Sequence, residues 1–138
     1  MASESITKYL ASDIEQHQEL FGEAFNSGDA DAVNSMYTED AVGVWDPGVP
    51  LSGEARREYV RRFLSHGPTV DATVLQTLVS GDQAMLVVEW TIDTKDDDGN
   101  PERLQGVAID VLKRGEDGNW RYVIDNPYGV SGPRTPQG

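Results

Sequence analysis

Two aspartates in apolar surroundings are the residues of this sequence best suited to moving protons. Asp46 directly precedes Pro47, which fixes its own φ angle and keeps Asp46 in extended backbone. The Asp46 carboxyl is therefore expected on a stiff turn beside Trp45, and a carboxyl next to a large aromatic side chain in an apolar cavity can act as an acid or a base. The alternative is a plain turn, because Asp46, Pro47 and Gly48 are all turn-forming residues.

The second aspartate, Asp110, is the one charged residue in the apolar run 104–112. Strand alternation places it on the same face as Gly106, Ala108 and Leu112. A carboxyl on such a face must be paired, face a cavity or be protonated. Gly106 and Ala108 are small, which leaves room for a ligand. The sequence therefore predicts that Asp110 is a buried acid or hydrogen-bond donor.

His17 is a third titratable candidate. It lies within an apolar stripe that also contains Ile14, Phe21 and Phe25, at the spacing of a helix. Two interpretations stay open for it. It is either a core histidine satisfied by a neighbour, or a donor or base that lines a pocket.

The elements that must position these residues fall into a helical first half and a β second half. Apolar spacing predicts helices over 4–27, over a short stretch from Asp29 to Tyr37, and over 54–65, with Ser52 as a cap of the last one. Alternation and glycine-containing turns predict strands over 69–80, 83–95, 102–114 and 119–126. Hairpins in series form a curved sheet. The expected fold class is therefore α+β, a cone-like curved and mostly antiparallel sheet with three N-terminal helices packed on its concave face.

The strand over 83–95 has one fully apolar face, which includes Trp90, and one mixed face, which includes Glu89. Helices can cover only one side of the sheet, so the other side needs a second cover. We expect Trp90 on the convex side, buried with Ile109 in a twofold homodimer.

Composition narrows the classes of partner and compartment. The 138 residues are long enough for one domain, expected over 1–128, and the breaker-rich tail 129–138 is expected to be disordered. A net charge of −13 argues against nucleic acid and anionic membranes as partners. There is no cysteine and no apolar run of spanning length, and a cytoplasmic protein is the default expectation.

The aspartate run 96–98 lacks the acidic position that completes a calcium loop, so we expect neither a metal nor a cofactor.

Arginines crowd the predicted helix over 54–65. A solvated face balanced by Glu54 and Glu58 explains them, and a docking site for an acidic pathway protein is the alternative. The four residues are Arg56, Arg57, Arg61 and Arg62.

The order of these segments resembles the nuclear transport factor 2-like superfamily, which includes ketosteroid isomerases and SnoaL-like polyketide cyclases. The resemblance rests on Phe25–Asp31, Met36–Ala41, the Asp-Pro pair, the helix that follows Leu51-Ser52-Gly53 and the four long strands, and it covers nearly the whole chain. The ending Tyr122–Gly129 resembles small members attached to polyketide and enediyne pathways. That fold hosts many activities, so the resemblance specifies the fold more closely than the function.

Ketosteroid isomerases use an aspartate directly before proline as the general base, and the resemblance assigns that position to Asp46. Their oxyanion hole uses an aspartate held protonated by its apolar site, in a strand like Val107–Asp110, and the resemblance makes Asp110 this donor. Their second donor is a tyrosine on the first helix. Phe21 occupies that position, so the resemblance leaves His17 or Tyr37 as substitutes.

Three functions are compatible with these features. The first is a cofactor-free enzyme, an isomerase, cyclase or hydrolase acting on a hydrophobic carbonyl-bearing small molecule of secondary metabolism, with Asp46 as base and Asp110 as acid. The others are a non-catalytic small-molecule-binding module and an accessory dimerisation module. The residues expected to contact the ligand are His17, Phe21, Tyr37, Trp45, Phe63, Glu89, Ala108, Asn126 and Tyr128.

Overall fold

The computed structural model describes residues 8–130 of the chain. Asp13 and Gly28 define the two ends of the first long helix in this part. Helix α2 (Ile14–Ser27) begins where the Asp13 side chain accepts a hydrogen bond from the Glu15 backbone N–H at 3.0 Å. It ends at Gly28, whose φ of 79° is the left-handed conformation that glycine adopts without strain.

The expectation that this helix extends back across residues 8–13 is wrong, and residues 4–7 lie outside the described part. The reason is a backbone pairing: Ala11 forms an isolated bridge to Trp120, and the Trp120 N–H donates to the Ala11 carbonyl at 2.8 Å. This segment is thereby tied to the edge of the sheet. It cannot also continue the helix.

We expect Asp13→Ala to lower the free energy of unfolding by about 1 kcal/mol, because the substitution removes the side-chain cap of α2. Urea unfolding followed by circular dichroism measures the change. Ser12→Ala, one residue earlier and equally exposed, is the matched control and should change stability by less than about 0.5 kcal/mol. Equal losses in both variants would mean that the cap contributes nothing.

Two shorter helices follow. Helix α3 (Ala30–Ser35) is capped by Asp29, whose carboxylate accepts from the Ala32 N–H at 3.0 Å. Helix α4 (Gly53–Leu64) buries Val60 and Leu64, and its N-cap residue Ser52 makes no capping hydrogen bond with its side chain. The described residues therefore contain three helices, in the regions where helices were predicted.

The arginines of α4 have separate environments. Arg57 and Arg61 pair with Glu54, and Arg61 also pairs with Glu58, at 2.9–3.0 Å. Arg56 is only 3% exposed, so it cannot be part of a surface that docks a partner. For Arg56 the docking interpretation is wrong.

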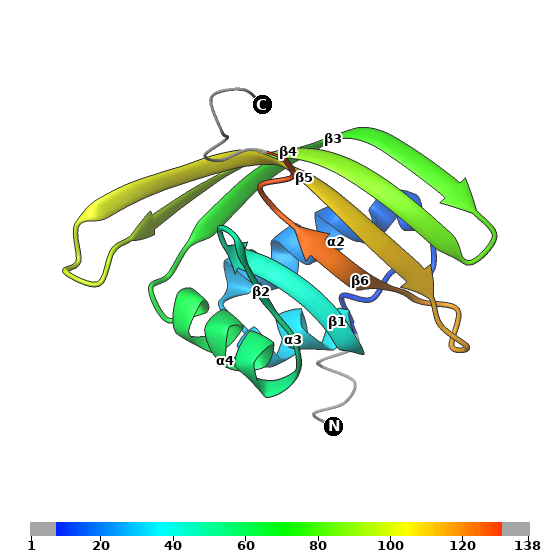
Figure 1. Cartoon of the computed structure of the whole chain (residues 1–138), viewed down its shortest axis with the longest axis horizontal. Helices are drawn as coiled ribbons and strands as arrows, with labels where there is room; N and C mark the ends of the chain where they lie inside the picture. The colour runs from blue at the N-terminus through cyan, green and yellow to red at the C-terminus, as the bar shows by residue number, and fades with distance from the viewer. Residues whose placement is uncertain (1–7, 131–138) are drawn as a thin grey trace.

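Six strands form one sheet in the order β2-β1-β6-β5-β4-β3, and every neighbouring pair except one is antiparallel. The exception is β1 with β6, which run parallel and join the first half of the chain to its last strand. Figure 1 shows the long strands arching over the helices, which confirms the predicted α+β cone. The strands are β1 (Tyr37–Asp46), β2 (Val49–Leu51), β3 (Thr69–Ser80), β4 (Gln83–Lys95), β5 (Pro101–Arg114) and β6 (Trp120–Asn126).

Trp90 lies on the concave face of the sheet, against the expectation for the convex one. It shares one face of β4 with the buried residues Leu86 and Val88, and it is only 7% exposed. A Cβ on Gly106 would come within 3.0 Å of the Trp90 indole, so this glycine lets the ring lie across the neighbouring strand. The room that Gly106 and Ala108 were expected to leave for a ligand is thus partly filled by Trp90.

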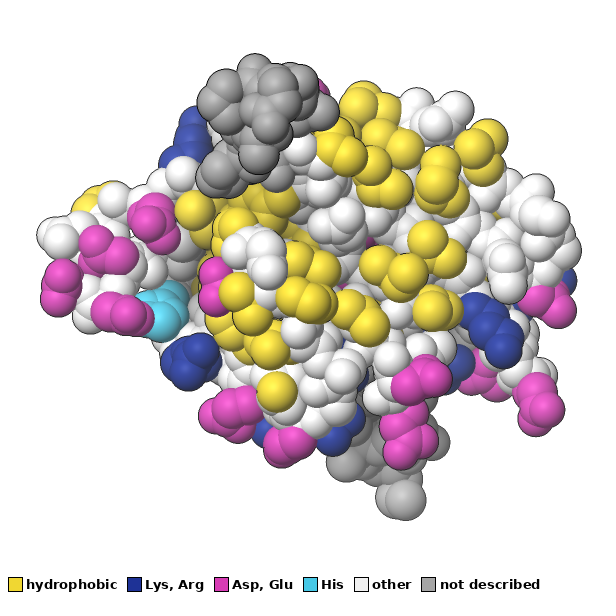
Figure 2. All heavy atoms as spheres, viewed as in Figure 1, with side chains coloured by type: hydrophobic (Ala, Val, Ile, Leu, Met, Phe, Trp, Pro, Cys, Tyr) yellow, Lys and Arg dark blue, Asp and Glu magenta, His cyan; other side chains and the backbone are white. Residues whose placement is uncertain are grey.

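The convex face and the far end of β3 present apolar side chains to solvent. Val107 and Ile124 are exposed on β5 and β6, and Leu75, Leu78 and Val79 are about half-exposed on β3. Figure 2 shows apolar side chains gathered over the β3–β4 arm. Within residues 8–130 no helix is long and apolar enough to cross a membrane.

The predicted tail begins with an ordered turn. The Gly129 N–H donates to the Asn126 carbonyl at 3.1 Å, and the Asn126 side chain donates to the Gly129 carbonyl at 3.3 Å. Gly129 is therefore part of the fold, and residues 131–138 of the predicted tail lie outside the described residues.

Candidate functional site

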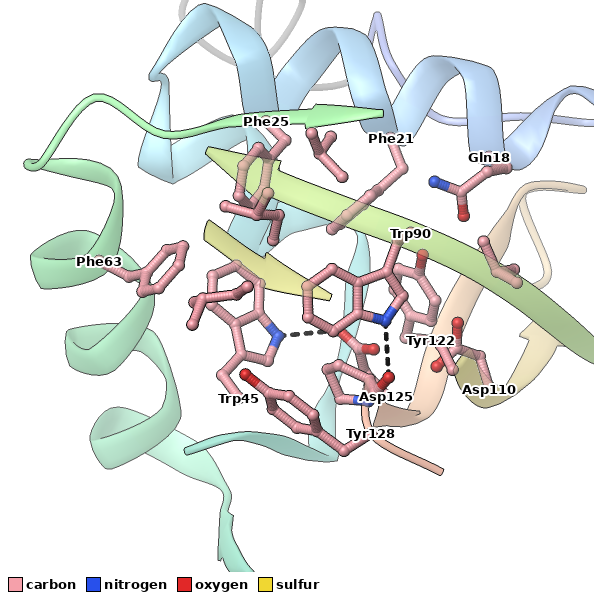
Figure 3. Close-up of a pocket in the computed structure, with 16 residues that line it drawn as sticks. Gln18, Phe21, Phe25, Trp45, Phe63, Trp90, Asp110, Tyr122, Asp125 and Tyr128 are labelled. Atoms are coloured by element: carbon pink, nitrogen blue, oxygen red, sulfur yellow. Dashed lines mark hydrogen bonds between the residues drawn. The ribbon is translucent and has the colours of Figure 1, made fainter. Parts of the chain in front are cut away.

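A mostly apolar cavity of about 70 Å³ lies between the helices and the concave face of the sheet. We call it the inner cavity. Aromatic rings from α2, β1, α4, β4, β6 and the turn after β6 line most of it (Figure 3). These residues are Phe21, Phe25, Trp45, Phe63, Trp90, Tyr122 and Tyr128.

Two carboxyl groups, Asp110 and Asp125, interrupt this apolar lining. They come from neighbouring strands, since Asp110 of β5 faces Asp125 of β6 in the sheet register, and they are 3% and 5% exposed. The two carboxyl groups are register partners on adjacent strands, and Asp110 Oδ1 accepts from the Asn126 N–H at 3.0 Å. Two neighbouring carboxyls buried in an apolar site repel each other when both are ionised, which favours the state in which one of them keeps its proton.

Asp110 is the group that keeps the proton. Burial raises the pKa of the Asp110 carboxyl well above its ordinary value, and the negative charge of Asp125 raises it further. Asp125, by contrast, has two hydrogen-bond donors on one oxygen: the Trp45 indole N–H at 2.9 Å and the Tyr37 hydroxyl. Because these donors stabilise negative charge on Asp125, the pair consists of a neutral acid and a carboxylate.

The Asp110 proton has a consequence for stability. Because the folded pKa lies above the unfolded one, Asp110 stabilises the fold most below the unfolded value, and this contribution is lost as pH rises toward the folded pKa. Asp110→Asn does not titrate, and its amide oxygen can still accept from the Asn126 N–H. We expect the variant to gain stability relative to wild type as pH rises from 4, by at most about 1.4 kcal/mol per pH unit.

Urea unfolding of both proteins at pH 4, 5, 6 and 7 measures this difference. Asp46→Asn, which changes a carboxyl outside the inner cavity, is the matched control and should show no such trend. A stability difference between wild type and Asp110→Asn that is constant with pH would contradict a buried, protonated Asp110.

Tyr122 supplies a hydroxyl that sequence reasoning did not consider. The residue is 1% exposed and lines the inner cavity, and its ring packs edge-on against Phe21 at 5.2 Å. Burial and the charges of Asp110 and Asp125 raise the pKa of Tyr122 well above its usual range, so the phenol stays protonated. Its hydroxyl makes no hydrogen bond within residues 8–130. It is therefore a donor available to a ligand in the cavity.

Neither substitute considered for the missing phenol at Phe21 is free for that role. The Tyr37 hydroxyl already donates to Asp125, and burial raises the pKa of Tyr37 well above its ordinary value. His17 is fully buried behind Phe21 and Tyr122, and it does not line the inner cavity. Burial lowers the pKa of His17 to about 3, so it is neutral.

Behind Tyr37 lies the buried cation Arg56. Its guanidinium is 4.4 Å from the centre of the Tyr37 ring, and in the described part of the chain its Nε and Nη1 atoms have no hydrogen-bond partner. Burial lowers the pKa of Arg56, while the neighbouring Tyr37 and Asp125 oppose that effect. The cation favours negative charge on Asp125.

The other residues expected from the sequence are distributed as follows. Phe21, Trp45, Phe63, Ala108 and Tyr128 line the inner cavity together with Asp110. Asn126 holds Asp110 and Gly129 but is not in the lining. Glu89 is exposed and alternates with Val88 and Trp90, so it faces away from the cavity, and its expected contact with a ligand there is wrong.

Asp46 does not reach the inner cavity. It ends β1, pairs with Val49 across the turn at Pro47 and Gly48, and lines a separate groove outside. Its expected role as base next to Asp110 is therefore wrong on position, and the plain-turn interpretation describes its backbone. Asp125 occupies the place that the sequence reasoning assigned to Asp46.

Comparisons with known proteins were consistent with this fold. The sequence profile of the SnoaL-like domain matches residues 17–123. A ketosteroid isomerase-like protein from Erwinia carotovora atroseptica is similar in structure, with a TM-score of 0.72 and 18% identity over 86% of this chain and 95% of that one. A candidate dehydratase of the NTF2-like family from Streptomyces avermitilis gives a TM-score of 0.69 and 19% identity over 88% and 99%.

A third similar structure is a candidate calcium/calmodulin dependent protein kinase II association domain from Xanthomonas campestris, with a TM-score of 0.71 and 18% identity over 87% of each chain. None of the curated proteins matches the sequence. The structural similarities establish the fold, and the profile covers more than half of the 138 residues. The chain therefore belongs to the SnoaL-like domain family.

Proposed function

We propose that this protein is a cofactor-free acid–base catalyst that acts on a hydrophobic, carbonyl-bearing small molecule, as an isomerase, cyclase or hydrolase. The observation that supports this most directly is the Asp110–Asp125 pair in the wall of an apolar cavity. Two carboxyls held in different protonation states provide an acid and a base at one place.

The proposed roles follow from the donors around each group. The Asp125 carboxylate takes a proton from the carbon next to the substrate carbonyl, and the electron pair of that C–H bond moves onto the carbonyl oxygen. That oxygen accepts hydrogen bonds from protonated Asp110 and from the Tyr122 hydroxyl. Asp125 then returns the proton to the same carbon or to a conjugated one, so isomerisation needs no other reactant, whereas hydrolysis also consumes a water molecule.

A proton-exchange assay tests the proposal without knowledge of the natural substrate. Cyclohexanone, 2-cyclohexen-1-one and 4-phenylcyclohexanone are incubated with the protein in D₂O, and the loss of protons next to the carbonyl is followed by NMR. We expect exchange faster than in buffer for at least one ketone. Asp31→Asn should exchange within about twofold of wild type, because Asp31 is exposed and lines neither the inner cavity nor the groove outside it. Exchange equal to buffer for all three ketones would contradict the proposal.

A binding module without chemistry is the second candidate, and the predominantly apolar lining favours it. The two functions differ in what they require of the carboxyl pair. A buried ionisable pair is often replaced by apolar residues without loss of stability. If Asp110→Leu/Asp125→Leu binds 4-phenylcyclohexanone as tightly as wild type and wild type catalyses no exchange, the binding module is the better description.

We further propose that a second copy of the chain covers the convex face of the sheet. Val107 and Ile124 are exposed there, next to the partly buried Ile109. Sedimentation equilibrium at micromolar concentration tests this, and a monomer would contradict it. The resemblance of the segment Tyr122–Gly129 to natural-product pathway members supports a substrate from secondary metabolism.

A further inference from the structure

The inner cavity is too small for most ligands of enzyme pockets. Ordinary small-molecule sites have volumes of about 300–1,000 Å³, whereas this one has about 70 Å³. A single water needs about 10–15 Å³ of such volume, so the cavity accommodates about five to seven non-hydrogen atoms. That is roughly one ring.

A much larger space lies directly outside. The outer groove, which includes Asp46, Tyr59, Arg62 and Glu102 in its wall, has a volume of about 600 Å³. The inner cavity and the outer groove share four side chains, which form the partition between them. These are Trp45, Phe63, Leu104 and Tyr128.

The partition is built from aromatic pairs that are held in place. Trp45 and Phe63 pack edge to face at 5.4 Å, and Trp90 and Tyr128 do the same at 5.4 Å. The indole N–H of Trp45 donates to Asp125, and that of Trp90 donates to the Pro127 carbonyl at 2.6 Å. Figure 3 shows Phe63, Trp45 and Tyr128 on one side of the cavity and Asp110 on the other. A molecule entering from the outer groove therefore passes the aromatic rings before it reaches the carboxyl pair.

The outer groove has a mixed lining. Tyr59 and Phe63 stack with their rings 16° from parallel, which offers a flat apolar wall. The charged residues of the groove carry both signs, since Arg62 and Lys95 lie near Asp46 and Glu102, and His66 contacts Asp97 at 3.3 Å. Figure 2 shows this mixture on the left, where acidic and basic side chains and a histidine surround apolar ones. Charges of both signs favour an uncharged occupant over an ion.

We infer that the substrate is an elongated molecule with two unlike ends. A compact apolar end of about one ring, which bears the carbonyl, occupies the inner cavity. A larger uncharged portion, aromatic or polar, passes the partition and lies in the outer groove against Tyr59. The identity of the carbonyl end rests on the proposed function, whereas the division of the ligand between the two spaces rests on the cavities alone.

Binding of two ketones that share one end tests the inference. Cyclohexanone represents the compact end, and 4-(4-hydroxyphenyl)cyclohexanone adds a ring opposite the carbonyl. Dissociation constants come from isothermal titration calorimetry of the full chain. We expect the extended ketone to bind wild type at least tenfold more tightly than cyclohexanone. Equal affinities, or no binding of either ketone, would overturn the inference.

Three variants locate the two ends of the ligand. Tyr59→Ala should weaken the extended ketone at least threefold and leave cyclohexanone unchanged. Tyr9→Ala changes a tyrosine in a different groove and should affect neither ketone. Ala108→Leu fills the inner cavity and should weaken both at least tenfold. Circular dichroism confirms that each variant is folded.

Two results would overturn the inference: Tyr59→Ala weakening both ketones equally, or Ala108→Leu leaving the extended ketone unaffected. Failure of the proposed function has a different signature, because it appears in the exchange assay. If the variants show the expected binding pattern but wild type exchanges no protons, the two-part ligand site is supported and the catalytic role is not.

Discussion

Asp125→Asn is expected to lower the rate of proton exchange by about 10²–10⁴-fold, the range for loss of a general base. The amide has almost the shape of the carboxylate, and its oxygen can still accept from the Trp45 N–H and the Tyr37 hydroxyl. It cannot take a proton from carbon. The affinity for 4-phenylcyclohexanone should therefore stay within about tenfold of wild type, a difference of ~1.4 kcal/mol.

The NMR exchange assay measures the rate, and calorimetry measures the affinity. Asp110→Asn is the informative companion, because its amide N–H can still donate to the substrate oxygen and part of the activity should remain. If Asp125→Asn exchanged protons as fast as wild type, Asp125 would not be the base. If it failed to fold, Asp125→Ser would serve instead.

His17→Leu is expected to remove a large part of the acid sensitivity of the fold. His17 is fully buried, and neither ring nitrogen has a partner among the described residues. Its pKa is about 3 in the folded protein, against about 6.5 in the unfolded chain. The folded pKa is depressed, so the contribution of His17 to stability is present above pH 6.5 and is lost as pH falls toward 3. Across this window the loss is about 4–5 kcal/mol.

Urea unfolding of wild type and His17→Leu at pH 7.5, 6, 5 and 4 measures the effect. Leucine has a similar volume and no proton to bind, so the variant should gain stability relative to wild type at each step down in pH. His66→Gln is the control, because the His66 side chain is 27% exposed and contacts Asp97 at the surface. Parallel pH profiles for wild type and His17→Leu would show that His17 is not buried in its neutral form.

The sequence was sufficient to predict the positions of most of the strands and helices. Strands β3 and β4 have the predicted bounds, because the two β-rich runs are separated by a Ser-Gly-Asp turn in which Gly81 adopts a φ of 60°. The start of α2 was missed, since an apolar stripe cannot show that Ala11 pairs with Trp120, more than one hundred positions away. Such long-range contacts override local periodicity.

The candidate site was predicted only in part. Asp110 was found because it is a single charge in an apolar strand. Asp125 was missed because β6 changes register: Tyr122 faces Leu112, but Ile124 faces Val111, so Val123 is an extra residue. This bulge puts Asp125 on the same buried side as Tyr122, although the two are three positions apart. Simple alternation assigns them to opposite faces. The aspartate-proline pair drew attention to Asp46 instead.

The parallel pairing of β1 with β6 determines when this site can form during synthesis. The Tyr37 hydroxyl and Asp125 are 88 positions apart, and no part of the chain before β6 can supply the carboxylate. A nascent chain that ends before β6 therefore contains the helices and the β3–β4–β5 hairpins but lacks Asp125. The β2–β1 pair joins strands β5, β4 and β3 in one sheet only when β6 inserts between β1 and β5. Pairings between distant segments form slowly. We expect a chain that is truncated within β6 to expose its aromatic interior and to bind chaperones.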